Sequence, residues 1–76
     1  MKVPLIRAAF ENIASHISNI DTIKSLVDEL ESKNLTTDVI IDTLQNEIKD
    51  AEVTLKTDIR ILINECRHLE SRKKNR

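Results

Sequence analysis

Residues 31–38 read Glu-Ser-Lys-Asn-Leu-Thr-Thr-Asp and interrupt a chain whose apolar residues otherwise recur every three or four positions. Asn34 can adopt the left-handed backbone conformation that ends a helix. Thr36 or Thr37 can cap the helix that follows. We therefore predict a turn at about residues 34–36. Because the stretch contains no glycine, a single helix that runs straight through it is the alternative.

The chain before this turn has the spacing of one amphipathic helix, which we expect over about residues 5–33. Pro4 suits the first turn of that helix, where its missing N–H would be unpaired in any case. Apolar residues follow at alternating intervals of four and three, as in the a and d positions of a coiled coil: Ile6, Phe10, Ile13, Ile17 and Ile20. The apolar line then shifts to Ile23, Val27 and Leu30, a change that overwinds a coiled coil locally.

After the turn we expect a second helix, over about residues 37–72. Its apolar positions are Ile41, Leu44, Ile48, Ala51, Leu55, Ile59, Leu62, Cys66 and Leu69. The steps before and after Leu55 are both four residues long, which unwinds a supercoil locally. Without this shift, Asp58 would occupy a core position of the heptad.

The composition and spacing predict an all-α fold. The 76 residues include no glycine and one proline, and Phe10 is the one aromatic residue, so the chain has little means of building a sheet or a phosphate-binding loop. Two helices joined by a short turn make an antiparallel, coiled-coil-like hairpin. We expect this helical hairpin to form one domain over residues 1–70, followed by a basic tail over residues 71–76.

A two-helix hairpin buries each apolar seam on one side only, so we expect further helices to complete its core. Isoleucine at both a and d positions favours three or four helices in cross-section. The expected assembly is a four-helix bundle, formed as a homodimer of hairpins or with a helical protein partner. The predicted interface consists of seam residues: Ile6, Phe10, Ile13, Ile17, Ile20, Val27, Leu44, Ile48, Leu55, Ile59, Leu62 and Leu69.

Charge is unevenly distributed along the chain. Residues 1–66 carry seven Lys or Arg against twelve Asp or Glu, a net charge of −5, whereas residues 67–76 carry five against one, a net charge of +4. The basic residues of the second segment are Arg67, Arg72, Lys73, Lys74 and Arg76. They form a possible contact for nucleic acid or an acidic partner. The structural alternative is a solvated tail that complements the helix dipole.

No catalytic, cofactor-binding or metal-binding motif is recognisable, and we expect neither an enzyme nor a cofactor. Cys66 and His68 lie two residues apart, and on a helix they point about 200° away from each other, too far to hold one ion. His16 flanks the first seam, where we expect exposure to solvent. These features favour a non-enzymatic protein–protein interaction or oligomerisation module. A small nucleic-acid-associated or regulatory protein that uses the basic C-terminal end is the alternative.

The sequence also indicates a compartment. Cys66 has no second cysteine to pair with, which favours a reducing environment. No apolar run approaches the roughly 18 residues of a membrane-spanning helix, and the first residues lack the pattern of a cleaved signal peptide. We therefore expect an intracellular protein, cytoplasmic or nuclear, with no membrane partner.

Overall fold

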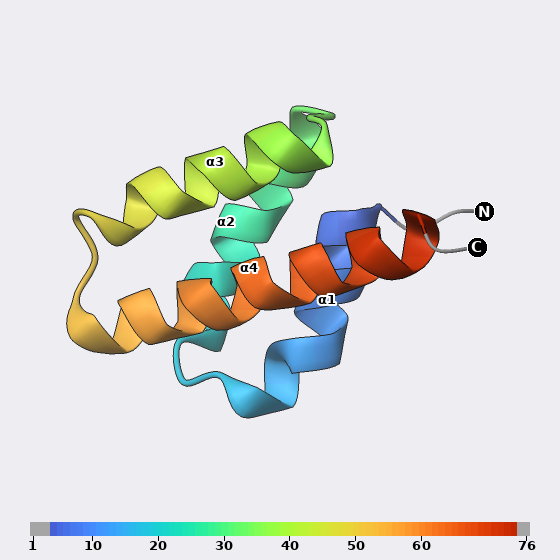
Figure 1. The fold of residues 1–76 in the computed structure, drawn as a ribbon. Coiled ribbons are helices and arrows are strands. Elements are labelled where there is room, and N and C mark those ends of the chain that lie inside the picture. The colour runs from blue at the N-terminus through green and yellow to red at the C-terminus, as the bar shows by residue number, and fades with distance from the viewer. Residues whose placement is uncertain (1–3, 75–76) are drawn as a thin grey trace.

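The computed structural model describes residues 4–74, and all of their regular structure is helical (Figure 1). The elements in chain order are α1 (Leu5–Ile13), a short 3-10 turn η1 (Ala14–His16), α2 (Ile20–Ser32), α3 (Thr37–Ile48) and α4 (Val53–Lys74). The prediction of an all-α fold is confirmed. None of the helices in the described part of the chain is long and apolar enough to cross a membrane.

The helices form two layers. Helices α3 and α4 run in opposite directions side by side, and α1 and α2 lie behind them (Figure 1). Helix α1 contacts both α2 and α4. The Cα radius of gyration is 11.7 Å, close to the about 11.4 Å expected of a compact domain of this length. The longest dimension is 36 Å, whereas a continuous helix over residues 37–72 would measure about 54 Å.

The turn between α2 and α3 has the chemistry expected of residues 31–38. Asn34 has a φ of 55°, in the left-handed region, and it is the one non-glycine residue with positive φ among residues 4–74. Thr36 is the N-cap of α3, and its hydroxyl oxygen accepts a hydrogen bond from the Val39 N–H at 3.4 Å. Asp38 lies in the first turn of α3, where a negative charge is favourable.

The prediction of two continuous helices is corrected by the structure, which divides each of them in two. The first break comprises η1 and residues 17–19, and the second comprises residues 49–52. Each break is followed along the chain by a register shift of the apolar pattern, from Ile20 to Ile23 at the start of α2 and around Leu55 at the start of α4. A shift that would strain one long supercoil is accommodated here by bending the chain, so that the apolar residues on either side of the bend face the same core.

The first break is held by the carboxylate of Asp58, which is only 3% exposed. Ile17 is extended, with φ −116° and ψ 155°, so the next two amides leave the helical hydrogen-bond pattern. The Ser18 N–H donates to Asp58 Oδ2 at 3.1 Å, and the Asn19 N–H donates to the same oxygen at 2.7 Å. The Asn19 side-chain amide also donates to it, at 2.9 Å. Asp58 thereby attaches the α1–α2 connection to α4.

We predict that Asp58→Asn destabilises the fold by about 1–3 kcal/mol, because the amide loses the charge that strengthens these hydrogen bonds and its nitrogen replaces the oxygen that accepts the Ser18 N–H at 3.3 Å. The measurement is urea unfolding followed by far-UV circular dichroism. Asp42→Asn, at an exposed position of α3, is the matched control and should change stability by less than about 0.5 kcal/mol. Equal losses in the two variants would contradict the role assigned to Asp58.

The second break joins α3 to α4 in a short connection. The N–H groups of Lys49, Asp50 and Ala51 donate to carbonyls three residues earlier, at 3.2–3.3 Å. Bonds of this type tighten and end the last turn of a helix. The chain then reverses, and α4 begins at Val53.

The core is completed within one chain. All four helices contribute to it, and its buried residues are Ile6, Ala9, Phe10, Ile13, Ile17, Ile23, Val27, Leu30, Ile40, Leu44, Ile59, Leu62, Ile63 and Cys66. Every buried side-chain nitrogen or oxygen among the described residues has a hydrogen-bond partner. A two-helix hairpin would need a second copy to cover its seams, and this bundle does not. The premise from which we expected dimerisation is therefore removed, because the two bends let one chain supply all four helices.

We predict that Leu62→Ala, at a position with 0% exposure, destabilises the protein by about 2–5 kcal/mol through lost burial and the cavity it leaves. Val53→Ala, at a position 78% exposed, should cost less than about 0.5 kcal/mol. Urea unfolding of both variants measures the difference. Similar losses would mean that α4 turns a different face to the core.

Candidate functional site

The strongest candidate site is a groove between α3 and α4. It has a volume of about 220 Å³ and is lined by Gln45, Ile48, Arg60, Ile63, Asn64 and Arg67. The two helices are joined at one end by residues 49–52. Near the other end, the Thr37 hydroxyl donates a hydrogen bond to Glu70 Oε1 at 3.1 Å. The walls of the groove are therefore fixed at both ends.

The groove has an apolar floor and a polar rim. Ile63 is buried and Ile48 is half-buried, whereas Gln45 and Asn64 are exposed. Two long cationic side chains and two amides thus surround a small apolar strip. This combination suits a ligand or partner that has both an apolar surface and anionic groups.

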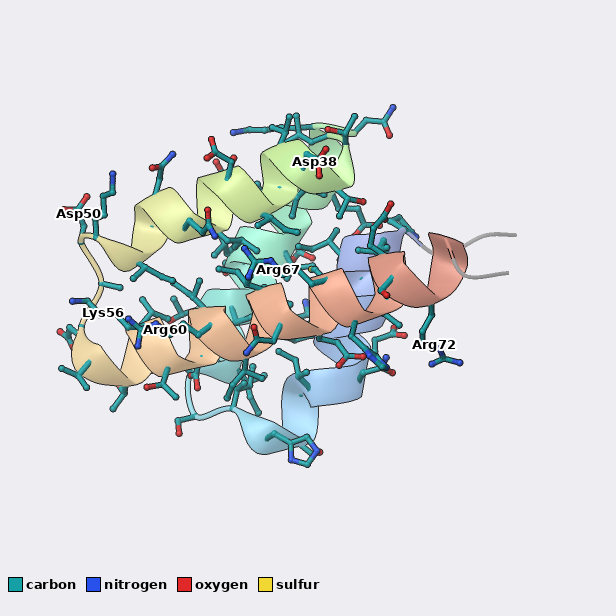
Figure 2. The ribbon with its side chains drawn as sticks, in the orientation of Figure 1. Asp38, Asp50, Lys56, Arg60, Arg67 and Arg72 are labelled. Atoms are coloured by element: carbon teal, nitrogen blue, oxygen red, sulfur yellow. The ribbon has the colours of Figure 1, made fainter. Side chains whose placement is uncertain are left out.

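The α4 rim carries a line of positive charge. Lys56, Arg60 and Arg67 follow one another at spacings of four and seven residues, which places them on one face of the helix. Figure 2 shows Arg67 between α4 and α3, with Arg60 and Lys56 further along α4 toward the α3–α4 connection. None of the three forms a side-chain hydrogen bond or ion pair with any residue that the structure describes. We call these three residues the basic rim.

The α3 rim has the opposite charge. Asp38 and Asp42 lie one turn apart on α3, and both are exposed. Gln45, which lines the groove, continues their face of the helix three residues later. Within residues 4–74 neither carboxylate is hydrogen-bonded or paired with a cation. We call Asp38 and Asp42 the acidic rim.

Arg7 shows by contrast how charges that serve the fold are arranged. Its guanidinium, on α1, donates hydrogen bonds to Glu31 Oε1 at 2.9 and 2.6 Å and to Asp28 Oδ1, both on α2. The hydrogen bond from Arg7 lowers the pKa of the Asp28 carboxyl below its usual value. This cluster connects α1 to α2. The charged side chains of the two rims, in contrast, form no hydrogen bond or ion pair within the described part of the chain.

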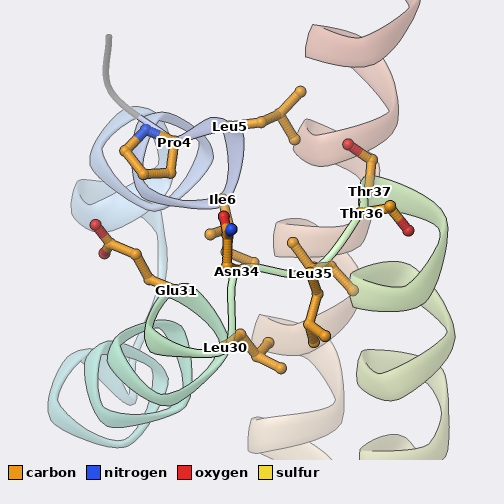
Figure 3. A pocket seen from close by; sticks show the side chains of 10 residues that line it. Pro4, Leu5, Ile6, Leu30, Glu31, Asn34, Leu35, Thr36 and Thr37 are labelled. Atoms are coloured by element: carbon orange, nitrogen blue, oxygen red, sulfur yellow. The ribbon is translucent and has the colours of Figure 1, made fainter. Parts of the chain in front are cut away.

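A second cavity, of about 240 Å³, lies where the start of α1 meets the α2–α3 turn (Figure 3). Its wall includes the polar side chains of Glu31, Thr36 and Thr37. Glu31 is bonded to Arg7, Thr36 caps α3 and Thr37 is bonded to Glu70. The fold thus already uses these groups, which makes this cavity the weaker candidate.

The structure places most of the predicted interface residues inside the core. Ile6, Phe10, Ile13, Ile17, Val27, Leu44, Ile59 and Leu62 are buried there, and Ile48, Leu55 and Leu69 are partly buried against it. Ile20 is 43% exposed at the start of α2. The seams therefore pack against one another within the chain, and of the predicted interface only Ile48 lines the groove.

The predicted basic contact is divided by the structure. Arg67 lines the groove, whereas Arg72 points away from α3 on the other side of α4 (Figure 2). Five residues turn an α-helix by about 140°, which explains the separation. The side chains of Lys73 and Lys74, and all of Arg76, lie outside the described residues. We did not predict Lys56 and Arg60, although their helical spacing from Arg67 was a readable signal.

The remaining reactive side chains do not gather into a second site. His16 and His68 are exposed on different elements, and Cys66 is buried on the inner face of α4. No group of three or more His, Cys, Asp or Glu side chains suited to a metal ion occurs among the described residues. Burial raises the pKa of the Cys66 thiol to about 12.

We predict that Cys66 reacts with iodoacetamide at neutral pH at least about a thousand times more slowly in the native protein than in urea, because the raised pKa alone reduces its thiolate fraction by about that factor. Mass spectrometry of timed samples measures the two rates. Equal rates would place Cys66 on the surface and contradict the orientation of α4.

Comparison of the chain with protein-family models, with curated proteins and with solved structures finds no match in any of the three.

Proposed function

We propose that this protein is a non-enzymatic protein–protein interaction module, and that its binding surface is the groove between α3 and α4. The observation that carries the proposal is the basic rim. Lys56, Arg60 and Arg67 stand on one face of α4, beside an apolar floor, without a partner among the described residues.

The fold gives no reason for this arrangement. Uncharged polar residues at the same positions would keep α4 helical and soluble, and three cations in line repel one another. A partner that carries carboxylates would relieve this repulsion. It would also cover Ile48 and Ile63 on the floor of the groove.

The shape of the groove favours a helical partner. An amphipathic helix can lie in the groove between two antiparallel helices, with its apolar face inward and its charged residues toward the rim. Acidic residues seven positions apart would match Arg60 and Arg67, which have the same separation on α4. The proposed surface therefore differs from the apolar seams predicted from the sequence, because the seams are already covered.

The nucleic-acid alternative receives less support. Arg67 and Arg72 lie on different sides of α4 (Figure 2), so they do not add to one basic patch. The acidic rim lies on the face of α3 that Gln45 continues into the groove, and its carboxylates would repel a phosphate backbone.

The experiment is a titration with a synthetic amphipathic helical peptide that has an apolar stripe and glutamates seven residues apart. We predict shifts of the backbone amide NMR signals of Gln45, Asn64 and Arg67, together with binding that weakens as salt increases from about 0.01 to about 0.15 M. Arg67→Glu should weaken binding by about tenfold, or ~1.4 kcal/mol.

Two controls make the titration specific. Arg72→Glu makes the same charge change on the other side of α4 and, at about 0.15 M salt, should leave the affinity within about twofold of the unmodified chain, since the Debye length there is only about 8 Å. A peptide of the same composition with a scrambled apolar stripe should bind more weakly. Signal changes away from the groove, or equal losses in the two arginine variants, would contradict the proposal.

A further inference from the structure

We infer that the partner this groove fits is a second copy of the same chain, with α4 of one copy lying over α3 of the other. The inference rests on the proposed function and names the partner of the same surface. It differs from the dimer of hairpins predicted from the sequence, because it uses the charged α3–α4 face and leaves the apolar core within each copy.

The two rims have opposite charges, and these charges form no ion pair with each other among the described residues. Helix α3 carries Asp38, Asp42 and Glu47 and no Lys or Arg. On the groove side of α4 stand the cations of the basic rim. No ion pair joins the rims within the described residues. Each rim is therefore complementary to the other rim of a second molecule.

Symmetry decides how two such faces can meet. A two-fold axis that runs along the groove exchanges its two sides, so each acidic rim meets a basic rim and the same contact forms twice. A two-fold axis across the groove would instead place α3 on α3 and α4 on α4, with like charges opposed. The charge pattern selects the first arrangement.

The alignment of α3 with α4 along the groove also brings opposite charges of the two copies together. The Thr37–Glu70 hydrogen bond aligns the start of α3 with the end of α4. An axis along the groove preserves position along it, so Asp38 and Asp42 of the second copy come opposite the α4 segment that contains Arg67. Gln45 of the second copy comes opposite Asn64. At the other end Lys49 approaches Lys56, so the attraction is concentrated at the end with Asp38 and Asp42.

The size of the face predicts a weak, reversible dimer. Twelve residues of α3 extend about 18 Å, and two neighbouring helices span about 20 Å in width. A face of these dimensions buries less area than a stable interface, which buries about 800 Å² on each partner. We therefore expect association at high micromolar concentration and at low salt.

Variants in which the charges of one rim are reversed test the inference. One variant, Arg60→Glu with Arg67→Glu, has two acidic rims, and the other, Asp38→Lys with Asp42→Lys, has two basic rims. By sedimentation velocity, the unmodified chain should show a monomer–dimer equilibrium that weakens at least about tenfold between about 0.01 and about 0.15 M salt. Each variant alone should remain monomeric, and an equimolar mixture should form a heterodimer.

A second pair of variants controls for general attraction between oppositely charged proteins. Lys24→Glu with Arg72→Glu, and Glu11→Lys with Asp21→Lys, make the same changes of charge away from the groove, at exposed positions. At about 0.1 M salt, where the Debye length is about 10 Å, each should dimerise by itself about as the unmodified chain does, and mixing the two should give no more dimer than either forms alone. Circular dichroism on every variant verifies that the helices are intact.

The inference is overturned if the unmodified chain is monomeric at about 1 mM and low salt, a concentration at which a contact worth about 4 kcal/mol would be half-populated. It is also overturned if the groove variants dimerise normally or if the control mixture associates as strongly as the groove mixture. If the chain is monomeric but still binds the acidic helical peptide, the second copy is refuted as the partner. The proposed function of the groove as a protein–protein interaction surface would then still stand. A monomer that binds no peptide would refute both.

Discussion

The fold depends on one buried carboxylate. The chain has no glycine, and its first half must nevertheless bend sharply between α1 and α2 so that both contribute to one core. Asp58 makes this possible by accepting the hydrogen bonds of the Ser18 and Asn19 backbone N–H groups, which have left the helical pattern at the bend. Burying a charge is unfavourable unless it is well hydrogen-bonded, and the three donors meet that condition.

Asp58 also explains where reasoning from the sequence succeeded and where it failed. Helical periodicity identified the class of fold and most of the core, because apolar residues three and four apart must share a face whatever the helix length. The Asn34 turn was readable because its stop and start signals are adjacent in the chain. The bend at residues 17–19 was not readable from local signals, because its acceptor lies about 40 residues later on another helix. The register shifts were visible, but they lie in α2 and α4 just after the bends, so they did not locate the bends themselves.

The candidate site was predicted only in part, for a related reason. The sequence indicated that Arg67 and Arg72 belong to a basic segment, but linear proximity is not proximity on a helix. The structure separates them and associates Arg67 with Arg60 and Lys56, at helical spacing. Gln45 and Ile48 join the same groove from α3, and that pairing depends on the reversal at residues 49–52. Which side chains share a surface was therefore settled by tertiary packing.

The closed core has a consequence for the timing of any association. Because the apolar side chains of the core are already covered, a partner at the α3–α4 groove meets the charged rims and only a narrow apolar strip. Opposite charges accelerate diffusional encounter, whereas a small contact at a solvated rim contributes little to the lifetime of a complex. The groove is thus suited to fast capture and fast release. Its occupancy would follow changes in local concentration and ionic strength almost immediately.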